Sequence, residues 1–299
     1  METLVSVRRP VRELRPGDHA LLAFANDEER RHVVGSFVRC GLEAGDKVIV
    51  LGESALRVTP PGTAPGTSPG TQGAGTRSPG LRVIPLEELG GPSCPPAAVG
   101  DALVREILRA RQEGYETVRV TADLTWAVRR PGGLEPLLGS ELQIERAIRP
   151  STAVIAICCY DRRRCTPDEL GSLHRSHDVL VGPDPEFDDT VLRIVRTFEP
   201  AGLALSGELD ASRHTVLDRA LGRLASSVNG REIHLDLAGL SFIDLGSINM
   251  LAETARRRAE RGPLVLDRMS PQFRTVMETV GWHMMPGLRL GECPDRPTS

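Results

Sequence analysis

The stretch that decides the fold of the C-terminal half is Leu235–Leu251, LDLAGLSFIDLGSINML. Its first part is an apolar run that ends at Asp244, as in a buried strand. Beyond that residue, Ile248 and Leu251 recur at a helical spacing. We therefore predict a strand that leads directly into an amphipathic helix, with Asp244 at the junction and Ser247 in the first helical turn.

Strands and helices are also predicted to alternate along the rest of the chain. This alternation favours α/β folds with mostly parallel strands and helices packed on the sheet. We predict an N-terminal domain over residues 12–185, a C-terminal α/β domain over 190–292 and a tail over 293–299. The N-terminal strands are predicted from the runs HALLAF (19–24), KVIVLG (47–52), LRVIPL (81–86), TVRVTAD (117–123) and STAVIAICCY (151–160).

Two segments of unusual composition interrupt this pattern. Residues 59–80, TPPGTAPGTSPGTQGAGTRSPG, contain too few apolar side chains to offset the entropy of ordering, so we predict a disordered insert within the first domain. Residues 183–189, PDPEFDD, are rich in proline and aspartate and are predicted to form a hinge between the domains.

The composition argues against several classes of function. A net charge of −3 and 3% aromatic residues are not typical of a protein that binds nucleic acid or an anionic membrane surface. No signal peptide is recognisable, and the longest apolar run, AVIAICCY at 153–160, is too short to cross a bilayer. We expect a cytoplasmic protein whose six cysteines are reduced thiols.

Polar residues that follow the predicted strands are candidates for a small-molecule site. Asp123 and Trp126 follow one strand, and Asp161 and Arg162 follow another. Ligands of open α/β sheets bind at the carboxyl ends of the strands, where these side chains are expected. The arginine run that begins at Arg162 either chelates an anionic group or is a solvated charged segment.

Histidine and cysteine are the common ligands of zinc in proteins. Cys165, His174 and His177 match no standard zinc spacing and lack a fourth ligand, so we expect no metal site from them. Cys158 and Cys159 are adjacent in a strand and must point to opposite faces of the sheet. They are interpreted as core residues.

Two known families resemble the two halves. Residues 12–185 resemble a MEDS domain, a bacterial sensory module related to RecA-like ATPases, and residues 190–292 resemble a STAS domain of the anti-sigma factor antagonist type. The MEDS resemblance rests on PGDHALLAFANDEE (16–29), GLEAGDKVIVL (41–51), VTADLTWAV (120–128) and AICCYDRRRCTPDEL (156–170). The STAS resemblance rests on LSGELDASR (205–213) and HLDLAGLSFIDLGSINML (234–251).

The first resemblance implies a RecA-like parallel sheet with a sensory function. No P-loop is present, because the only lysine, Lys47, enters a strand, so ATP hydrolysis is not expected and no cofactor is implied. A Gly-Asp-His like the one ending at His19 recurs in the family. His19 is therefore either a ligand contact or a hydrogen-bonded residue at the start of a strand.

The second resemblance implies that the chain docks a protein partner. In switching relatives, the loop after this strand reads Asp-Ser-Ser-Gly and the second serine is phosphorylated. Gly246 occupies that position here, so Ser247 is a phosphosite only in a shifted geometry, and otherwise a small residue in a turn capped by Asp244. Asp210 and Ser212 are expected to shape the same partner-binding face.

The resulting hypothesis is a cytoplasmic bacterial signalling regulator without enzymatic activity. Its sensory domain would bind a small molecule or a protein signal. Its STAS domain would bind an anti-sigma factor or a related kinase-like ATPase, without a serine phosphoswitch. The alternatives are a small-molecule carrier or enzyme centred on Asp161, and a scaffold that binds its partners constitutively.

Overall fold

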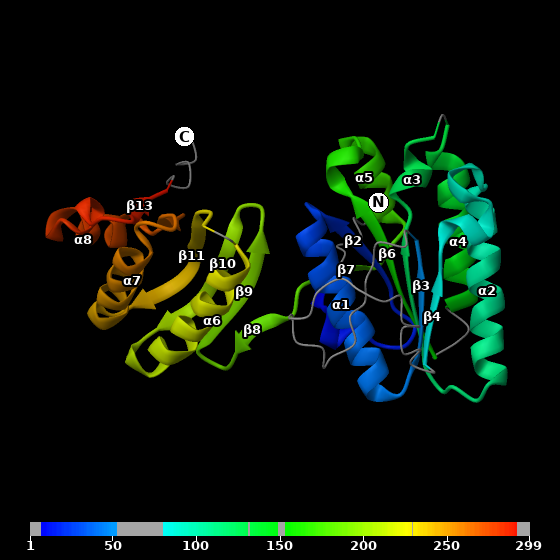
Figure 1. Cartoon of the computed structure of the whole chain (residues 1–299), viewed down its shortest axis with the longest axis horizontal. Helices are drawn as coiled ribbons and strands as arrows, with labels where there is room; N and C mark the ends of the chain where they lie inside the picture. Colours follow the sequence, from blue (N-terminus) through cyan, green and yellow to red (C-terminus); the bar gives the residue numbers. More distant parts are fainter. Residues whose placement is uncertain (1–6, 53–79, 131, 149–152, 229, 292–299) are drawn as a thin grey trace, which may run out of the picture. The chain divides into compact units, whose positions relative to one another are not determined.

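The computed structural model describes residues 7–52, 80–130, 132–148, 153–228 and 230–291. The chain divides into two compact units, Met1–Pro183 and Asp184–Ser299 (Figure 1). Apart from Gly80, the insert predicted at 59–80 lies outside the described residues, as does the tail predicted at 293–299.

The first unit is built on a seven-stranded sheet in the order β1-β7-β2-β6-β5-β3-β4. Every pair of neighbouring strands that the structure describes in this sheet is parallel. The α/β class predicted for this unit is therefore confirmed. The strands are β1 (Val7–Pro10), β2 (His19–Phe24), β3 (Lys47–Leu51), β4 (Leu81–Ile84), β5 (Val118–Asp123), β6 (Val154–Asp161) and β7 (Val179–Gly182).

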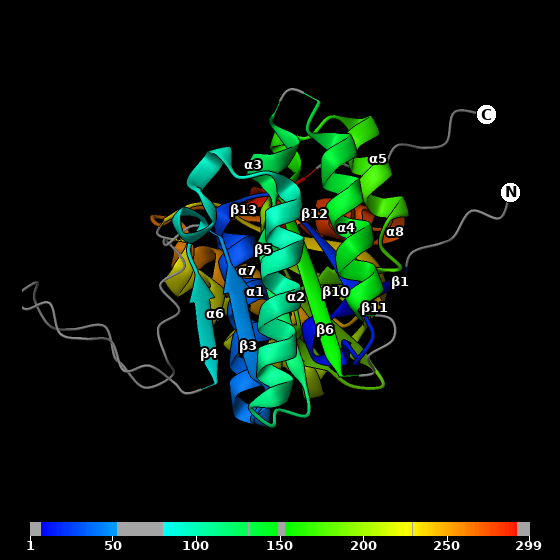
Figure 2. The same ribbon diagram turned by 90° about the vertical axis from the view of Figure 1, so that its right-hand side faces the viewer.

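Helices cover both faces of this sheet, because its strands carry apolar side chains on both faces. Leu22 and Phe24 pack with α1, whereas Leu21 and Tyr160 pack with α2, α4 and α5. Figure 2 shows α2 and α4 side by side in front of the strands. The helices are α1 (Asp27–Ala44), α2 (Pro96–Gln112), α3 (Thr125–Val128), α4 (Leu134–Ile148) and α5 (Pro167–Arg175).

The register brings the ends of the central strands together. Phe24 at the end of β2 is opposite Asp161 at the end of β6, and Asp123 at the end of β5 is opposite Cys159. His19 begins β2 opposite Ala156 and therefore lies at the other end of that strand from Phe24. The polar residues that follow β5 and β6 thus share one edge of the sheet.

The second unit has a mixed six-stranded sheet in the order β13-β12-β11-β10-β9-β8. Strands β8, β9 and β10 are antiparallel neighbours, and β10 to β13 are parallel. The strands are β8 (Pro185–Asp188), β9 (Leu192–Phe198), β10 (Ala201–Leu209), β11 (Ile233–Ile243), β12 (Leu264–Asp267) and β13 (Leu288–Leu290). The helices are α6 (His214–Ser227), α7 (Leu245–Arg258) and α8 (Pro271–Val280).

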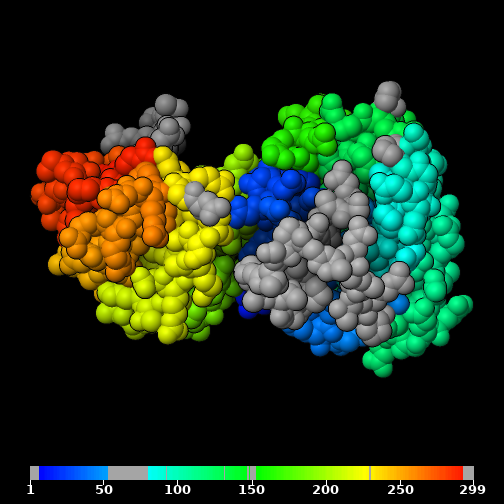
Figure 3. All heavy atoms as spheres, viewed as in Figure 1, coloured from blue at the N-terminus to red at the C-terminus, as the bar shows by residue number. Residues whose placement is uncertain are grey.

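Helices α6 and α7 lie next to each other on one side of this sheet. Arg257 of α7 reaches Asp218 of α6 at 3.3 Å, and the two helices form one continuous surface, olive to orange in Figure 3. Their apolar faces share one core with the strands, which includes Leu217, Leu235 and Leu251. The predicted passage from strand to helix is present, since β11 ends at Ile243 and α7 begins at Leu245.

Two short strands were not predicted from the sequence. The predicted hinge contains β8, an edge strand at Pro185–Asp188 that pairs with β9. The first sheet likewise begins at β1, which precedes the expected start at residue 12. Both strands contain four residues and each pairs on only one side, so neither carries the long apolar run by which buried strands are recognised.

Candidate functional site

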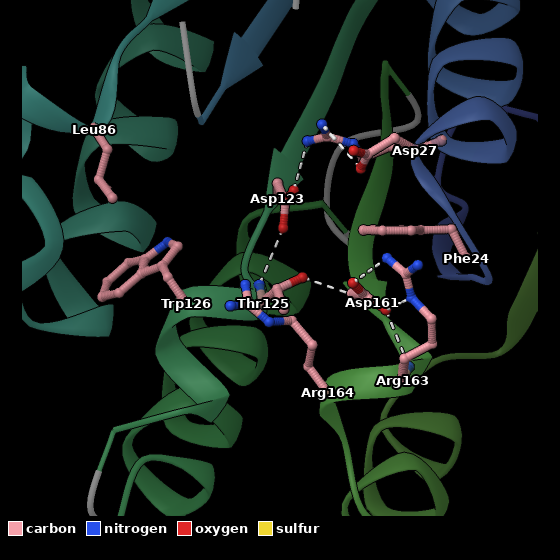
Figure 4. A pocket seen from close by; sticks show the side chains of 10 residues that line it. Phe24, Asp27, Leu86, Asp123, Thr125, Trp126, Asp161, Arg163 and Arg164 are labelled. Atoms are coloured by element: carbon pink, nitrogen blue, oxygen red, sulfur yellow. Dashed lines mark hydrogen bonds and ion pairs between the residues drawn. The ribbon is translucent and has the colours of Figure 1, made fainter. Parts of the chain in front are cut away.

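A solvent-open crevice of about 560 Å³ lies at the carboxyl edge of the first sheet. Strand ends supply Phe24, Asp123 and Asp161, because the parallel strands terminate together at this edge. Figure 4 shows the lining side chains converging from α1, β5, β6 and the segments that follow the strands. The complete lining is Phe24, Asp27, Arg30, Leu86, Asp123, Thr125, Trp126, Asp161, Arg163 and Arg164.

Carboxylates and guanidinium groups are paired within the crevice. Arg30 Nη1 donates to Asp123 at 2.7 Å, while Arg163 donates to both oxygens of Asp161 at 2.9 and 2.7 Å. The hydrogen bond from Arg163 is the main reason that the pKa of Asp161 is lowered. Asp161 is thus held as an anion against a cation, and its pKa is shifted in the direction opposite to that of a general acid.

Thr125 connects the two carboxylates. Its backbone N–H donates to Asp123 at 3.1 Å, and its hydroxyl accepts from the backbone N–H of Asp161 at 2.9 Å. This pattern fixes the ends of β5 and β6 relative to each other. The crevice is therefore largely preformed, as is usual for small-molecule sites.

An apolar wall completes the crevice. Trp126 and Leu86 form one side and Phe24 the other (Figure 4). Arg30 lies over the Phe24 ring at 5.6 Å, within the range of a cation–π contact. Among the described residues, no hydrogen-bond acceptor is found for the buried Trp126 Nε1.

A separate polar cluster is buried in the core of the same unit. His19, Glu141, Cys158 and His177 are each at most 3% exposed. Each offers one donor atom, and these four atoms lie within 4.8 Å of one another. Glu141 takes a core position of α4, on the helix face that also carries Leu137, Ile144 and Ile148.

The pKa values of this cluster are strongly perturbed. Burial alone would lower the pKa of His19, but its interactions with Glu141 and Glu145 outweigh burial and raise the pKa to about 9. Burial likewise opposes ionisation of Glu141, yet the neighbouring His177 and His19 lower its pKa to about 2. Burial is the dominant influence on His177 and lowers its pKa to about 4.

A third polar arrangement lies at the start of α7. Asp244 caps the helix and accepts from the backbone N–H of Ser247 at 2.6 Å. The Ser247 hydroxyl donates to the Leu209 carbonyl at 3.1 Å and accepts from His214 Nε2 at 2.8 Å. Ser247 has no exposed surface, so its hydroxyl is fully engaged inside the unit.

The surface around this helix start is apolar and exposed. Phe242 at the end of β11 and Leu245 at the start of α7 are 50% and 61% exposed. Gly246 is also exposed, and a Cβ atom there would approach Cε1 of His214 to 2.9 Å. Large exposed apolar side chains beside a charged cap are features of a protein-docking surface.

Comparison with family models assigns both units. The model of the MEthanogen/methylotroph, DcmR Sensory domain (MEDS) matches residues 18–178. The chain belongs to the MEDS family. A STAS domain model (Mlab, STAS domain) matches residues 192–289. A comparison with curated proteins gives no match.

The order of the two domains confirms the fusion expected from the sequence. A MEDS sensory unit followed by a STAS-like unit makes this chain a signalling regulator, and the STAS domain indicates protein–protein interaction. In the part of the chain that the structure describes, no helix has the length and hydropathy to cross a membrane.

Within the MEDS unit, the residues predicted to contact a ligand do not all lie at the same site. Asp123, Trp126 and Asp161 meet in the crevice. Arg162 is exposed and is not part of the lining, where its neighbours Arg163 and Arg164 lie instead. His19 does not reach the crevice and belongs to the buried cluster.

Several residues of these sites were not singled out from the sequence. Arg30 and Asp27 belong to the charged first turn of α1, and such a turn is common at the start of any solvent-exposed helix. Glu141 left a clearer signal, a carboxylate on the apolar face of a predicted helix, where an unpaired charge would be costly. His177 was compared with Cys165 and His174, but the structure groups it with His19, Glu141 and Cys158 instead.

In the STAS unit, the predicted partner-binding residues surround one helix start. Asp210 accepts from the backbone N–H of Ser212 at 3.0 Å and forms an exposed cap before α6. His214, the first residue of α6, reaches Asp244 at 3.3 Å and thereby connects this loop to the start of α7. The capping role expected for Asp244 is present, whereas the role of His214 was missed.

Proposed function

We propose that the chain is a cytoplasmic signalling regulator whose STAS unit binds an anti-sigma factor or a related kinase-like ATPase around the start of α7. The observation that carries this proposal is the exposed pair Phe242 and Leu245 beside the capped Asp244. An exposed apolar pair with a charged neighbour can supply the desolvated centre and the polar rim that a protein interface needs.

The docking in this proposal does not use a serine phosphoswitch. Ser247 is fully buried, and both hydrogen-bonding functions of its hydroxyl are occupied by Leu209 and His214. A kinase could reach the oxygen only after the first turn of α7 opened. Gly246, which has no hydroxyl, occupies the exposed position nearby.

The MEDS unit in this proposal senses a small polar molecule in the crevice and performs no chemistry. The lining carries three carboxylates and three guanidinium groups, so its charges balance. A molecule with both polar and apolar parts suits such a lining better than a simple anion does. Asp123 and Asp161 are both paired with arginines, which argues against either of them as a nucleophile or general acid.

The partner proposal is tested by binding to each purified kinase-like anti-sigma factor of the source organism, measured by calorimetry. We expect binding by the full chain and at least tenfold weaker binding by Leu245→Asp, as for the loss of a central interface contact. Leu108→Asp is the matched control, since Leu108 is 57% exposed but lies in the MEDS unit. Equal affinity of the two variants would exclude the α7 surface.

The absence of a switch is tested in the same mixtures. After incubation with the bound partner and Mg-ATP, intact mass and peptide mapping should find no phosphate on Ser247. Phosphate on Ser247 in the folded chain would contradict this part of the proposal while leaving the docking surface in place.

The sensory part is tested through the fluorescence of Trp126, which lines the crevice. The chain has one other tryptophan, Trp282, so Trp282→Phe leaves Trp126 as the only indole. A panel of small carboxylates, amines, alcohols and amino acids should contain molecules that shift its emission with saturation. Asp161→Ala should weaken that response, and a panel without any saturable shift would contradict a small polar ligand at this site.

A further inference from the structure

The buried cluster of the MEDS unit has the composition of a metal-binding site. Its donor atoms are two imidazole nitrogens, one thiol sulfur and one carboxylate oxygen, from His19, His177, Cys158 and Glu141. They come from the start of β2, the segment after α5, strand β6 and helix α4. We propose that these four side chains bind one divalent zinc ion in a closed, tetrahedral site.

Four of the six distances between the donor atoms are close to the edges of a zinc tetrahedron, and all six are within 4.8 Å. Zinc bonds of about 2.0–2.1 Å to nitrogen or oxygen and about 2.3 Å to sulfur place neighbouring donors about 3.3–3.6 Å apart. In this cluster, Glu141 Oε2 lies 3.1 Å from His19 Nε2, 3.2 Å from Cys158 Sγ and 3.6 Å from His177 Nε2. His19 Nε2 lies 3.3 Å from Cys158 Sγ.

The surrounding contacts orient the two imidazoles as metal ligands. His177 Nδ1 donates to the Leu173 carbonyl at 2.8 Å, so in the neutral ring Nε2 carries the lone pair. His19 Nδ1 bonds to Glu145 at 2.8 Å, which likewise leaves Nε2 directed at the cluster. A metal-binding histidine commonly donates its other ring nitrogen to a carbonyl or a carboxylate in this way.

Charge and burial favour zinc within this site. The thiolate of Cys158 and the carboxylate of Glu141 together balance a divalent cation, which matters because all four ligands lie in an apolar core. Tyr160 donates to the second oxygen of Glu141 and so holds the carboxylate in place. Mixed nitrogen, sulfur and oxygen donors in a tetrahedron are typical of zinc rather than of magnesium or calcium.

The site has a structural role in this proposal. All four positions of the tetrahedron are occupied by protein atoms, which leaves no coordination position for a substrate. None of the four ligands is among the residues that line the crevice. The ion would connect β2, β6, α4 and the segment after α5, and so stiffen the sheet that carries the crevice at its other edge.

The first test is the metal content of the full chain, purified without a metal-affinity tag or chelator. We expect one zinc ion per chain, and a higher melting temperature for the zinc form than for chelator-treated protein. After exchange for cobalt, absorption should show the intense ligand-field bands of tetrahedral cobalt and a thiolate-to-cobalt charge-transfer band. Folded protein that neither contains nor takes up zinc or cobalt would overturn the proposal.

Adjacent cysteines provide a matched pair of variants. Cys158→Ser should lose the charge-transfer band and bind zinc at least tenfold more weakly. Cys159→Ser should keep both, because Cys159 is equally buried but points to the other face of the sheet. Unchanged zinc affinity and an unchanged band in Cys158→Ser would place the metal elsewhere and overturn the site.

A variant outside the set of ligands tests the orientation of His19. Glu145→Gln retains all four donors and should weaken zinc binding by about 10- to 100-fold, as observed when the partner of a metal-binding histidine is removed. Circular dichroism confirms folding of each variant. If Cys158→Ser does not fold, the cobalt spectrum of the unaltered chain still decides whether a thiolate is bound.

Discussion

In the MEDS unit, four side chains that can carry charge or bind metal meet inside the core, whereas in the STAS unit the polar side chains gather around a helix start at the surface. His19 and Glu141 are 3% and 1% exposed. In the STAS unit, Asp244 and His214 each retain 27% of their side-chain exposure, and only Ser247 of that group is fully buried.

The buried cluster suits permanent binding of an ion, whereas the exposed helix start suits reversible binding of a protein. A buried cluster with fixed neighbours can hold an ion through the lifetime of the fold, but it cannot release it quickly. An exposed helix start with Phe242 and Leu245 beside it can bind and release a protein without any internal rearrangement. The crevice of the MEDS unit is intermediate, since its ion pairs are partly buried and open to solvent.

The largest expected effect comes from breaking the buried cluster. Glu141→Ala removes the fully buried one of the two carboxylates beside His19, and removal of one partner of a buried pair typically costs about 3–5 kcal/mol. We expect the unfolding free energy of the MEDS unit to fall by this amount, measured with denaturant in the presence of a chelator. A loss below about 1 kcal/mol is the value for an exposed pair, and it would show that the MEDS cluster is no more stabilising than the exposed polar groups of the STAS unit.

A smaller effect is expected at the one buried polar residue of the α7 start. Ser247→Asp places a carboxylate in a fully buried position beside Asp244, so we expect the STAS unit to lose about 2–4 kcal/mol. Ser247→Ala is the control and should lose about 1 kcal/mol, the value of an ordinary hydrogen bond. Thermal unfolding of the full chain can follow both variants.

If Ser247→Asp were as stable as the unaltered chain, the first turn of α7 would open easily. Phosphorylation of Ser247 would then be sterically feasible, and the argument against a switch would fail.

Much of the fold could be predicted from the sequence because its long elements carry strong patterns. The central strands are continuous apolar runs, and α1 has both Asn26 as its N-cap and Gly45 in a left-handed conformation at its end. Strands β1 and β8 were missed because edge strands of four residues lack such a pattern. The partner of β1 is β7, which is far away in the sequence, whereas β8 pairs with the next strand, β9.

Site residues could be predicted from the sequence only where the strand order of the sheet brings them together. Asp123 and Asp161 were found because carboxyl ends of parallel strands share an edge. The buried cluster was not, because its members are distributed over residues 19–177 and are brought together by packing alone. Glu141 in the apolar face of α4 was the one local sign that a buried partner exists.

The smallest expected effect is the pH dependence of the crevice pair. Arg163 lowers the pKa of Asp161 in the folded chain, so the pair stabilises the fold above the ordinary titration range of aspartate. This contribution is lost as the pH falls through the lowered pKa. Because the Arg163 side chain is 51% exposed, we expect only about 0.2–1 kcal/mol. Acid unfolding of the MEDS unit should therefore be slightly less steep in Asp161→Asn, and an effect as large as that of Glu141→Ala would show that the crevice is as tightly built as the core.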